Sequence, residues 1–129
     1  MNTDRELLEA AAKAAGVDGE YRTENLCLDG DWIDVTAIFL SDDQGWWNPL
    51  TDDGDALRLA VDLYLEVAPC PALPQVGRPN PCTIVCDGEP ASFRVEESGP
   101  DAYANTRRAI VRVAATKPSV NLCAARASS

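Results

Sequence analysis

The fold is decided around residues 45–61, which read Gly45-Trp46-Trp47-Asn48-Pro49-Leu50-Thr51-Asp52-Asp53-Gly54-Asp55-Ala56-Leu57-Arg58-Leu59-Ala60-Val61. Hydroxyl and carboxylate side chains within residues 51–53 can cap free backbone N–H groups, so a helix is predicted to begin there. Apolar residues then recur at the spacing of one helical face, at Leu57, Ala60, Val61 and Tyr64. We expect this stripe to be buried, with Leu57 as a core side chain.

Two adjacent tryptophans precede this helix, directly after an acidic turn at residues 42–45. Trp46 and Trp47 are predicted to form a short returning strand, in which neighbouring side chains point to opposite faces. One ring is then expected in the core and the other at the surface; alternatively, the N-terminal helix or the C-terminal tail covers both. We predict that Asp42, Asp43, Trp46 and Trp47 bind a partner, because they combine charge with an aromatic side chain able to fill a pocket.

The flanking sequence alternates between helical and strand periods. Residues 4–15 are predicted to form a helix, because Thr3 and Glu6 make a capping box and Gly16 can end it. Residues 32–40 alternate with period two, as a half-buried strand does. Residues 83–86 and 91–96 are predicted to form a hairpin around Asp87-Gly88.

A third helix is predicted after Asp101. Its expected buried stripe consists of Tyr103, Thr106, Ile110, Val113 and Ala114. Five prolines within residues 69–81 predict a stiff surface loop without regular structure, either a connector or a partner-binding segment.

Together these elements predict an α+β domain over residues 1–117, with a flexible tail at 118–129. About three helices are expected to pack on a sheet of about four strands, with one hairpin. A strand, a helix and a second strand follow one another around residues 46–67, which predicts one right-handed βαβ crossover.

The charge is concentrated in one part of the chain. Residues 18–55 hold eleven acids and one base, Arg22, which equals the formal net charge of −10. This balance disfavours direct nucleic-acid binding, which depends on basic contacts to phosphate. The acidic segment is interpreted either as a solvated face or as a surface that meets a basic partner by imitating a phosphate backbone.

The composition also restricts chemistry and location. The chain has no histidine, which removes His-based metal sites and nucleophile pairs, and its five widely spaced cysteines indicate reduced thiols. Strand geometry separates Cys82 from Cys86 too far for a shared zinc ion. No apolar run approaches the roughly 20 residues that span a bilayer. We expect a cytoplasmic monomer or weak homodimer, with no membrane contact and no cofactor.

Two groups of acidic residues are candidates for metal binding or acid–base chemistry. The group Asp52, Asp53 and Asp55 lacks the ligand alternation of a calcium loop, and helix capping explains it without a metal. Paired carboxylates, Asp42 or Asp43 with Asp52 or Asp55, or a cysteine nucleophile are the remaining candidates for an enzyme. No catalytic residue is therefore assigned.

The central run Trp47-Asn48-Pro49-Leu50-Thr51-Asp52-Asp53-Gly54-Asp55-Ala56-Leu57 resembles the phage ABA sandwich domain family, as do, more weakly, residues 5–16 and 103–112. The proline loop and the cysteine-bearing tail depart from the family pattern. The resemblance implies an α/β/α sandwich and a phage or prophage origin, with no catalytic residue to carry over.

The function expected from the sequence is that of a non-enzymatic phage accessory protein that binds an unknown host or phage protein. An acidic, nucleic-acid-mimicking inhibitor of a host protein and a small enzyme of unknown chemistry are the alternatives.

Overall fold

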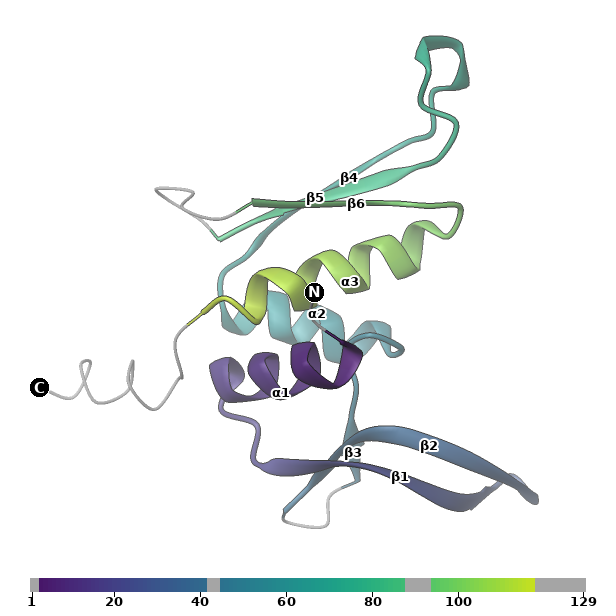
Figure 1. Cartoon of the computed structure of the whole chain (residues 1–129), viewed down its shortest axis with the longest axis vertical. Coiled ribbons are helices and arrows are strands. Elements are labelled where there is room, and N and C mark those ends of the chain that lie inside the picture. The colour runs from purple at the N-terminus through teal and green to yellow at the C-terminus, as the bar shows by residue number, and fades with distance from the viewer. Residues whose placement is uncertain (1–2, 42–44, 88–93, 118–129) are drawn as a thin grey trace, which may run out of the picture.

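A computed structural model describes residues 3–41, 45–87 and 94–117, and within these ranges the chain forms three α-helices and six strands. The helices lie as a layer between two separate sheets (Figure 1). In chain order the elements are α1 (Asp4–Ala15), β1 (Gly19–Leu28), β2 (Asp31–Leu40), β3 (Trp46–Trp47), α2 (Asp53–Asp62), β4 (Glu66–Cys70), the 3-10 helix η1 (Pro74–Val76), β5 (Cys82–Cys86), β6 (Arg94–Ser98) and α3 (Ala102–Ala114).

The α+β class and the three helices are confirmed, but the strands form two sheets. The orders are β1-β2-β3 and β4-β5-β6, and every strand pair among them is antiparallel. The predicted βαβ crossover is therefore wrong, because α2 carries the chain from β3 in one sheet to β4 in the other. The layer order also differs from the α/β/α order that the resemblance implies, since the helices lie between the sheets.

Helix α1 begins and ends as predicted. Thr3 Oγ1 accepts from the N–H of Glu6 while the Glu6 carboxylate accepts from the N–H of Thr3, which completes the capping box. The Glu6 carboxylate also accepts from the Thr3 hydroxyl, and the bonds that it accepts from the backbone and then the side chain of Thr3 lower the pKa of Glu6. Gly16 adopts the left-handed conformation at the other end, with φ of 75°.

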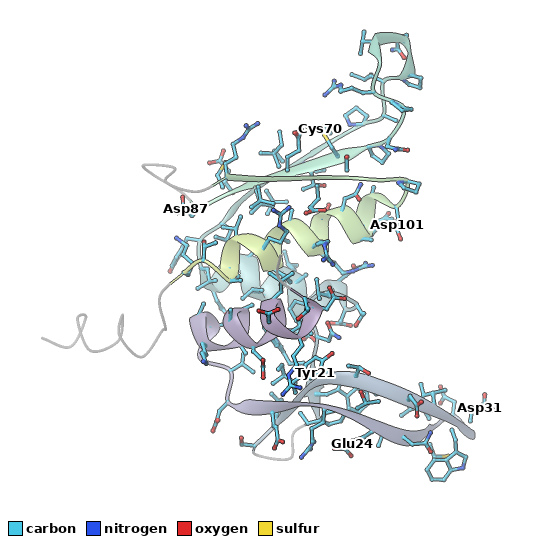
Figure 2. All side chains as sticks on the ribbon, viewed as in Figure 1. Tyr21, Glu24, Asp31, Cys70, Asp87 and Asp101 are labelled. Atoms are coloured by element: carbon cyan, nitrogen blue, oxygen red, sulfur yellow. The ribbon has the colours of Figure 1, made fainter. Side chains whose placement is uncertain are left out.

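Strands β1 and β2 form a long hairpin that extends away from the helices, with Asp31 near its far end (Figure 2). The predicted strand at residues 32–40 is confirmed within β2. Its predicted apolar face is buried at Ala37 and Phe39 but exposed at Ile33. The outer half of the hairpin extends past the helical layer, so it has no core to face.

The second sheet contains the predicted hairpin, whose strands pair from Cys82↔Ser98 to Cys86↔Arg94. Gly88 of the predicted turn and the first residues of the predicted strand at 91–96 fall within residues 88–93, which lie outside the described residues. The prediction that residues 69–81 lack regular structure is wrong in two places. Pro69 belongs to β4, an edge strand where a residue without an N–H is tolerated, and η1 forms at the tip of the connection.

One cluster of buried side chains connects the layers. It includes Leu7 and Leu8 of α1, Ile38 and Trp47 of the first sheet, Leu59 of α2, Val85 and Val95 of the second sheet, and Ile110, Val111 and Val113 of α3. Within the described residues no helix combines the length and the apolar character needed to cross a membrane. The predicted tail at 118–129 lies outside these residues.

The buried face of α2 differs from the predicted one. The core contains Ala56, Leu59 and Ala60, whereas Leu57, Val61 and Tyr64 are exposed, so only Ala60 of the predicted stripe is buried. Tyr103 of α3 is also exposed, although Ile110, Val113 and Ala114 are buried as predicted. Periodicity identified an apolar face of α2, but the packing of α2 against α3 buries the adjacent face.

Candidate partner-binding site

The exposed apolar face of α2 is the first component of the candidate site. The side chains of Leu57, Val61 and Tyr64 follow one another along this face and are 64%, 62% and 85% exposed. Scattered apolar side chains are ordinary on a protein surface, whereas a contiguous group indicates an interaction site. The arrangement exposes two large apolar side chains on α2, Leu57 and Val61, and a third, Tyr64, shortly after the last residue of the helix, Asp62.

A groove next to this face is formed by α2, α3 and β4. We call it the α2–α3 groove; its volume is about 530 Å³, and its lining consists of Asp53, Ala56, Leu57, Ala60, Val67, Pro69, Ala102, Tyr103, Thr106, Arg107 and Ile110. A second hollow of about 440 Å³ shares Leu57, Ala60 and Val67 with it and extends to Val61 and Tyr64. The two hollows therefore form one continuous apolar surface, and Tyr103, 72% exposed, lies on its α3 side.

Tyr64 is held in an unusual backbone conformation at the end of α2. Its φ is 56°, in the left-handed region that favours glycine. The N–H of Tyr64 donates to the carbonyl of Val61 and the N–H of Leu65 to that of Ala60, which are the two bonds of a Schellman motif. Gly16 occupies the equivalent position after α1. A strained, exposed aromatic residue beside an apolar hollow indicates a functional role for its ring.

Charged side chains border the groove. Arg107 of α3 donates from Nη1 to the Asp53 carboxylate at 2.7 Å and from Nε to the Leu50 carbonyl at 2.9 Å. This ion pair connects α3 to the start of α2 at one end of the groove. Asp62 and Glu66 are exposed near the other end of α2. The two charged side chains in the lining of the groove, Asp53 and Arg107, therefore pair with each other, and the two exposed acids lie outside the lining.

The residues predicted to bind a partner are only partly described. Asp42 and Asp43 lie outside the described residues. Trp47 is buried and pairs with Ile38, whereas Trp46 is 40% exposed and its ring lies 6.0 Å from that of Phe39. One tryptophan thus faces the core and the other the solvent, so the alternative that both are covered is wrong. Their role in recognition stays a prediction.

Sequence reasoning missed a second exposed aromatic group, at the end of the β1–β2 hairpin. Trp32 is 69% exposed and lies beside Ile33, among the exposed acids Asp29, Asp31 and Asp34. The signal that could have located it is the dipeptide Asp29-Gly30, which favours a tight hairpin turn. Both residues have positive φ, so the chain does reverse direction there.

Of the carboxylates considered for catalysis, Asp52 and Asp55 serve structural roles, whereas Asp42 and Asp43 lie outside the described residues. Asp52 caps α2 by accepting from the N–H of Asp55, and Asp55 accepts from the N–H of Asn48 and pairs with Arg58 at 2.8 Å. Within the described residues no group of three or more potential ligands could hold a metal ion. These contacts explain the acids of the α2 start as helix-capping groups.

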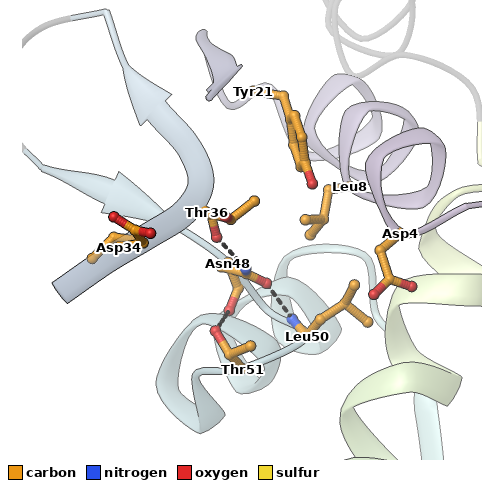
Figure 3. Close-up of a pocket in the computed structure, with 9 residues that line it drawn as sticks. Asp4, Leu8, Tyr21, Asp34, Thr36, Asn48, Leu50 and Thr51 are labelled. Atoms are coloured by element: carbon orange, nitrogen blue, oxygen red, sulfur yellow. Dashed lines mark hydrogen bonds between the residues drawn. The ribbon is translucent and has the colours of Figure 1, made fainter. Parts of the chain in front are cut away.

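A further hollow of about 390 Å³ lies between α1 and the first sheet, with Tyr21, Asp34 and Asn48 in its lining (Figure 3). Asn48 Nδ2 donates to the Thr36 carbonyl at 2.9 Å and its Oδ1 accepts from the N–H of Leu50 at 2.9 Å. The polar groups of Asn48 are thus used to connect β2 with the chain entering α2. The Asn48 side chain in the lining of this hollow therefore has a structural role where β2 meets the chain entering α2.

These features define an α+β protein with an apolar groove between α2, α3 and β4. No protein-family model matches the chain, and no curated protein or solved structure matches it either. Its function is therefore inferred from its own residues.

Proposed function

We propose that this protein is a non-enzymatic protein-binding module whose partner inserts an amphipathic helix with basic flanks into the α2–α3 groove. The observation that carries the proposal is the solvent exposure of Leu57 and Val61 on α2, and of Tyr64 shortly after its end, beside the groove. Apolar surface of this kind gains free energy when a partner removes it from water, at roughly 25 cal/mol for each Å².

The shape of the groove favours a helix over a strand as the occupant. Helices α2 and α3 form its sides, and recognition of a helix in a groove uses apolar anchors at the spacing of one helical face. An added strand would have to pair with the edge strand β4. Pro69 has no N–H to donate to such a strand, so this mode of binding is weakened.

The charge favours basic residues on the partner. Asp62 and Glu66 are exposed and adjoin in sequence Val61 and Leu65, which line the second hollow, and the chain carries a formal net charge of −10. Complementary charges at the border of an interface mainly accelerate association and select the partner, while the apolar anchors supply affinity. A lysine- or arginine-flanked helix therefore fits this surface better than an acidic one.

The biological setting is proposed from the sequence alone. The resemblance of residues 47–57 to the phage ABA sandwich domain family supports an accessory role in a phage or prophage, with a host or phage protein as the partner. The absence of a long apolar helix from the described residues is compatible with a partner in the bacterial cytoplasm.

Site-specific photo-crosslinking tests the proposal directly. Val61 in one variant and Thr23 in another are replaced by p-benzoylphenylalanine; both positions are exposed, but Thr23 lies on the β1–β2 hairpin. After illumination in bacterial lysate, mass spectrometry maps the partner segment joined to each position. We expect position 61, and not position 23, to capture a segment with helical apolar spacing and flanking basic residues.

Binding of the corresponding synthetic peptide provides the quantitative control. The double variant Leu57→Ser/Val61→Ser is expected to weaken binding at least about tenfold, which corresponds to roughly 1.4 kcal/mol. Trp32→Ser, a matched exposed apolar side chain outside the groove, is expected to leave the dissociation constant unchanged. Capture from position 23 alone, or equal binding by the groove variant, would contradict the proposal.

The acidic hairpin supports a second candidate function, that of a nucleic-acid-mimicking inhibitor. Glu20, Asp29, Asp31 and Asp34 are exposed on β1, β2 and the turn between them. If they imitate phosphates, DNA should compete for the captured partner, and Asp31→Asn/Asp34→Asn should reduce binding mainly at low salt. Capture of a partner without affinity for nucleic acid would exclude this function.

A further inference from the structure

Two cysteines face each other across β4 and β5. Cys70 and Cys82 are direct partners in the antiparallel register, so their side chains lie on the same face of the sheet. Directly opposed residues in such a pair have Cα atoms about 4.5–5.5 Å apart, and disulfide bonds form between Cα atoms about 4.4–6.8 Å apart. The backbone therefore already holds this pair at the separation that a disulfide requires.

The pair closes the base of a projecting segment. Residues 71–81 form an arm between β4 and β5, with η1 at its tip and an isolated bridge between Leu73 and Arg78 (Figure 1). Cys70 lies at the foot of this arm (Figure 2). A covalent bond between the last residue of β4 and the first residue of β5 would close the arm into a loop.

The two thiols differ in accessibility. Cys82 is 7% exposed, whereas Cys70 is partly exposed and donates from Sγ to the Ala68 carbonyl at 3.7 Å. Burial, followed by the neighbouring Cys70 side chain, raises the pKa of Cys82. A hollow of about 340 Å³ includes Cys82 and Arg78 in its lining, but Cys70 is the more exposed of the two thiols. Cys70 is thus the thiol that meets an oxidant first.

We propose that Cys70 and Cys82 are a redox-active dithiol, which a low-molecular-weight disulfide such as oxidised glutathione converts into an intrachain disulfide. The Cys70 thiolate attacks one sulfur of oxidised glutathione, forms a mixed disulfide and releases one glutathione. The Cys82 sulfur then attacks the Cys70 sulfur, forms the Cys70–Cys82 bond and releases the second glutathione. Two electrons pass to the oxidant, and the two thiol protons end on the two released glutathione molecules.

Differential alkylation of the full chain tests this assignment. The reduced protein is equilibrated with mixtures of oxidised and reduced glutathione, free thiols are blocked, and peptides are mapped by mass spectrometry before and after reduction. We expect Cys70 and Cys82 to lose reactivity together and to appear in one disulfide-linked peptide pair. Both thiols still alkylated in excess oxidant, or a disulfide to another cysteine, would overturn the proposal.

Variants distinguish the two sulfurs and supply a matched control. Cys82→Ser should stop the reaction at the mixed disulfide on Cys70, because no second thiol lies opposite it. Cys86→Ser is the control, since Cys86 is also in β5 but is paired with Glu66 and Arg94, and its loss should leave the linked peptide unchanged. Persistent mixed disulfide on Cys70 in the wild-type chain would show that Cys82 does not resolve it.

A thermal measurement gives a readout that does not depend on the variants. Closing residues 70–82 restricts the unfolded chain, so the oxidised protein should melt at least about 3 °C above the reduced protein. Reduction should reverse the shift. An oxidised form that melts at or below the temperature of the reduced form would show that the bond distorts the sheet, contrary to a pair already positioned for it.

Discussion

Tyr64 shows at the scale of one residue how the fold and the candidate site are connected. The Schellman motif at the end of α2 requires a left-handed residue, and α1 fulfils the same requirement with Gly16. A side chain in this conformation costs roughly 1–2 kcal/mol because Cβ crowds the following carbonyl. The exposed Tyr64 ring has little packing in the isolated chain to offset that cost, which favours a role in binding.

Replacing Tyr64 by glycine is therefore expected to spare or improve the fold. The substitution relieves the strain of the left-handed conformation, which raises the free energy of unfolding. The greater freedom of glycine in the unfolded chain lowers that gain by about 0.5–1 kcal/mol. The free energy of unfolding, measured with chemical denaturant, should be unchanged or up to about 1 kcal/mol higher. Tyr64→Ala keeps the strain and should remain within about 0.5 kcal/mol of wild type. A loss above about 1 kcal/mol in Tyr64→Gly would show that the ring stabilises the isolated protein.

At the scale of elements, α2 has two apolar faces with different roles. Leu59 is 1% exposed within the core, whereas Leu57 is 64% exposed beside the groove. Leu59→Ala is expected to lower the free energy of unfolding by about 2–5 kcal/mol, because it leaves a cavity. Leu57→Ala should change it by less than about 0.5 kcal/mol. If denaturation shows that both variants lose the same free energy of unfolding, another part of the chain must cover Leu57.

The junction between β3 and α2 depends on a buried amide. Asn48 accepts from the N–H of Leu50 and donates to the Thr36 carbonyl, so it joins β2 to the start of α2 (Figure 3). Asn48→Ala leaves these partners without their hydrogen bonds and should cost about 1–3 kcal/mol in thermal or chemical denaturation. Thr51→Ala is the matched control, because Thr51 is an exposed residue whose hydroxyl makes only a long hydrogen bond of 3.5 Å to the Asn48 carbonyl. A similar loss in both variants would count against a specific role for Asn48.

At the scale of the whole molecule, α3 connects the other elements electrostatically. Arg107 pairs with Asp53 of α2, Arg108 with Asp4 of α1 and Arg112 with Glu97 of β6. Most of these side chains are well exposed, and exposed pairs contribute roughly 0–1 kcal/mol each. The formal net charge of −10 acts against them, since like charges repel throughout the compact state.

Added salt is therefore expected to stabilise the protein. Raising NaCl from about 10 mM to about 300 mM shortens the screening length several-fold and should raise the melting temperature, because net repulsion outweighs three exposed pairs. Arg108→Gln makes the charge more negative and should increase the salt-dependent rise. Differential scanning calorimetry measures the salt-dependent rise in melting temperature of the wild type and of Arg108→Gln. A melting temperature that falls with salt would show that the ion pairs dominate.

The sequence by itself determined the features that depend on neighbouring residues. The Thr3–Glu6 capping box, the cap of α2 at Asp52, the pairing of β5 with β6 and the opposite orientations of Trp46 and Trp47 all follow from local geometry. Strand β1 gave little such signal, because residues on both of its faces are exposed along a hairpin that extends beyond the helices.

Only the tertiary structure decided which apolar residues are covered. Periodicity shows that Leu57, Val61 and Tyr64 share a face of α2, but burial depends on where α3 and the sheets pack, and they pack against Leu59 instead. The register of β4 with β5 likewise brought Cys70 to Cys82 across the arm. Both the candidate groove and the cysteine pair arise from contacts between segments distant in sequence, which is why local patterns did not reveal them.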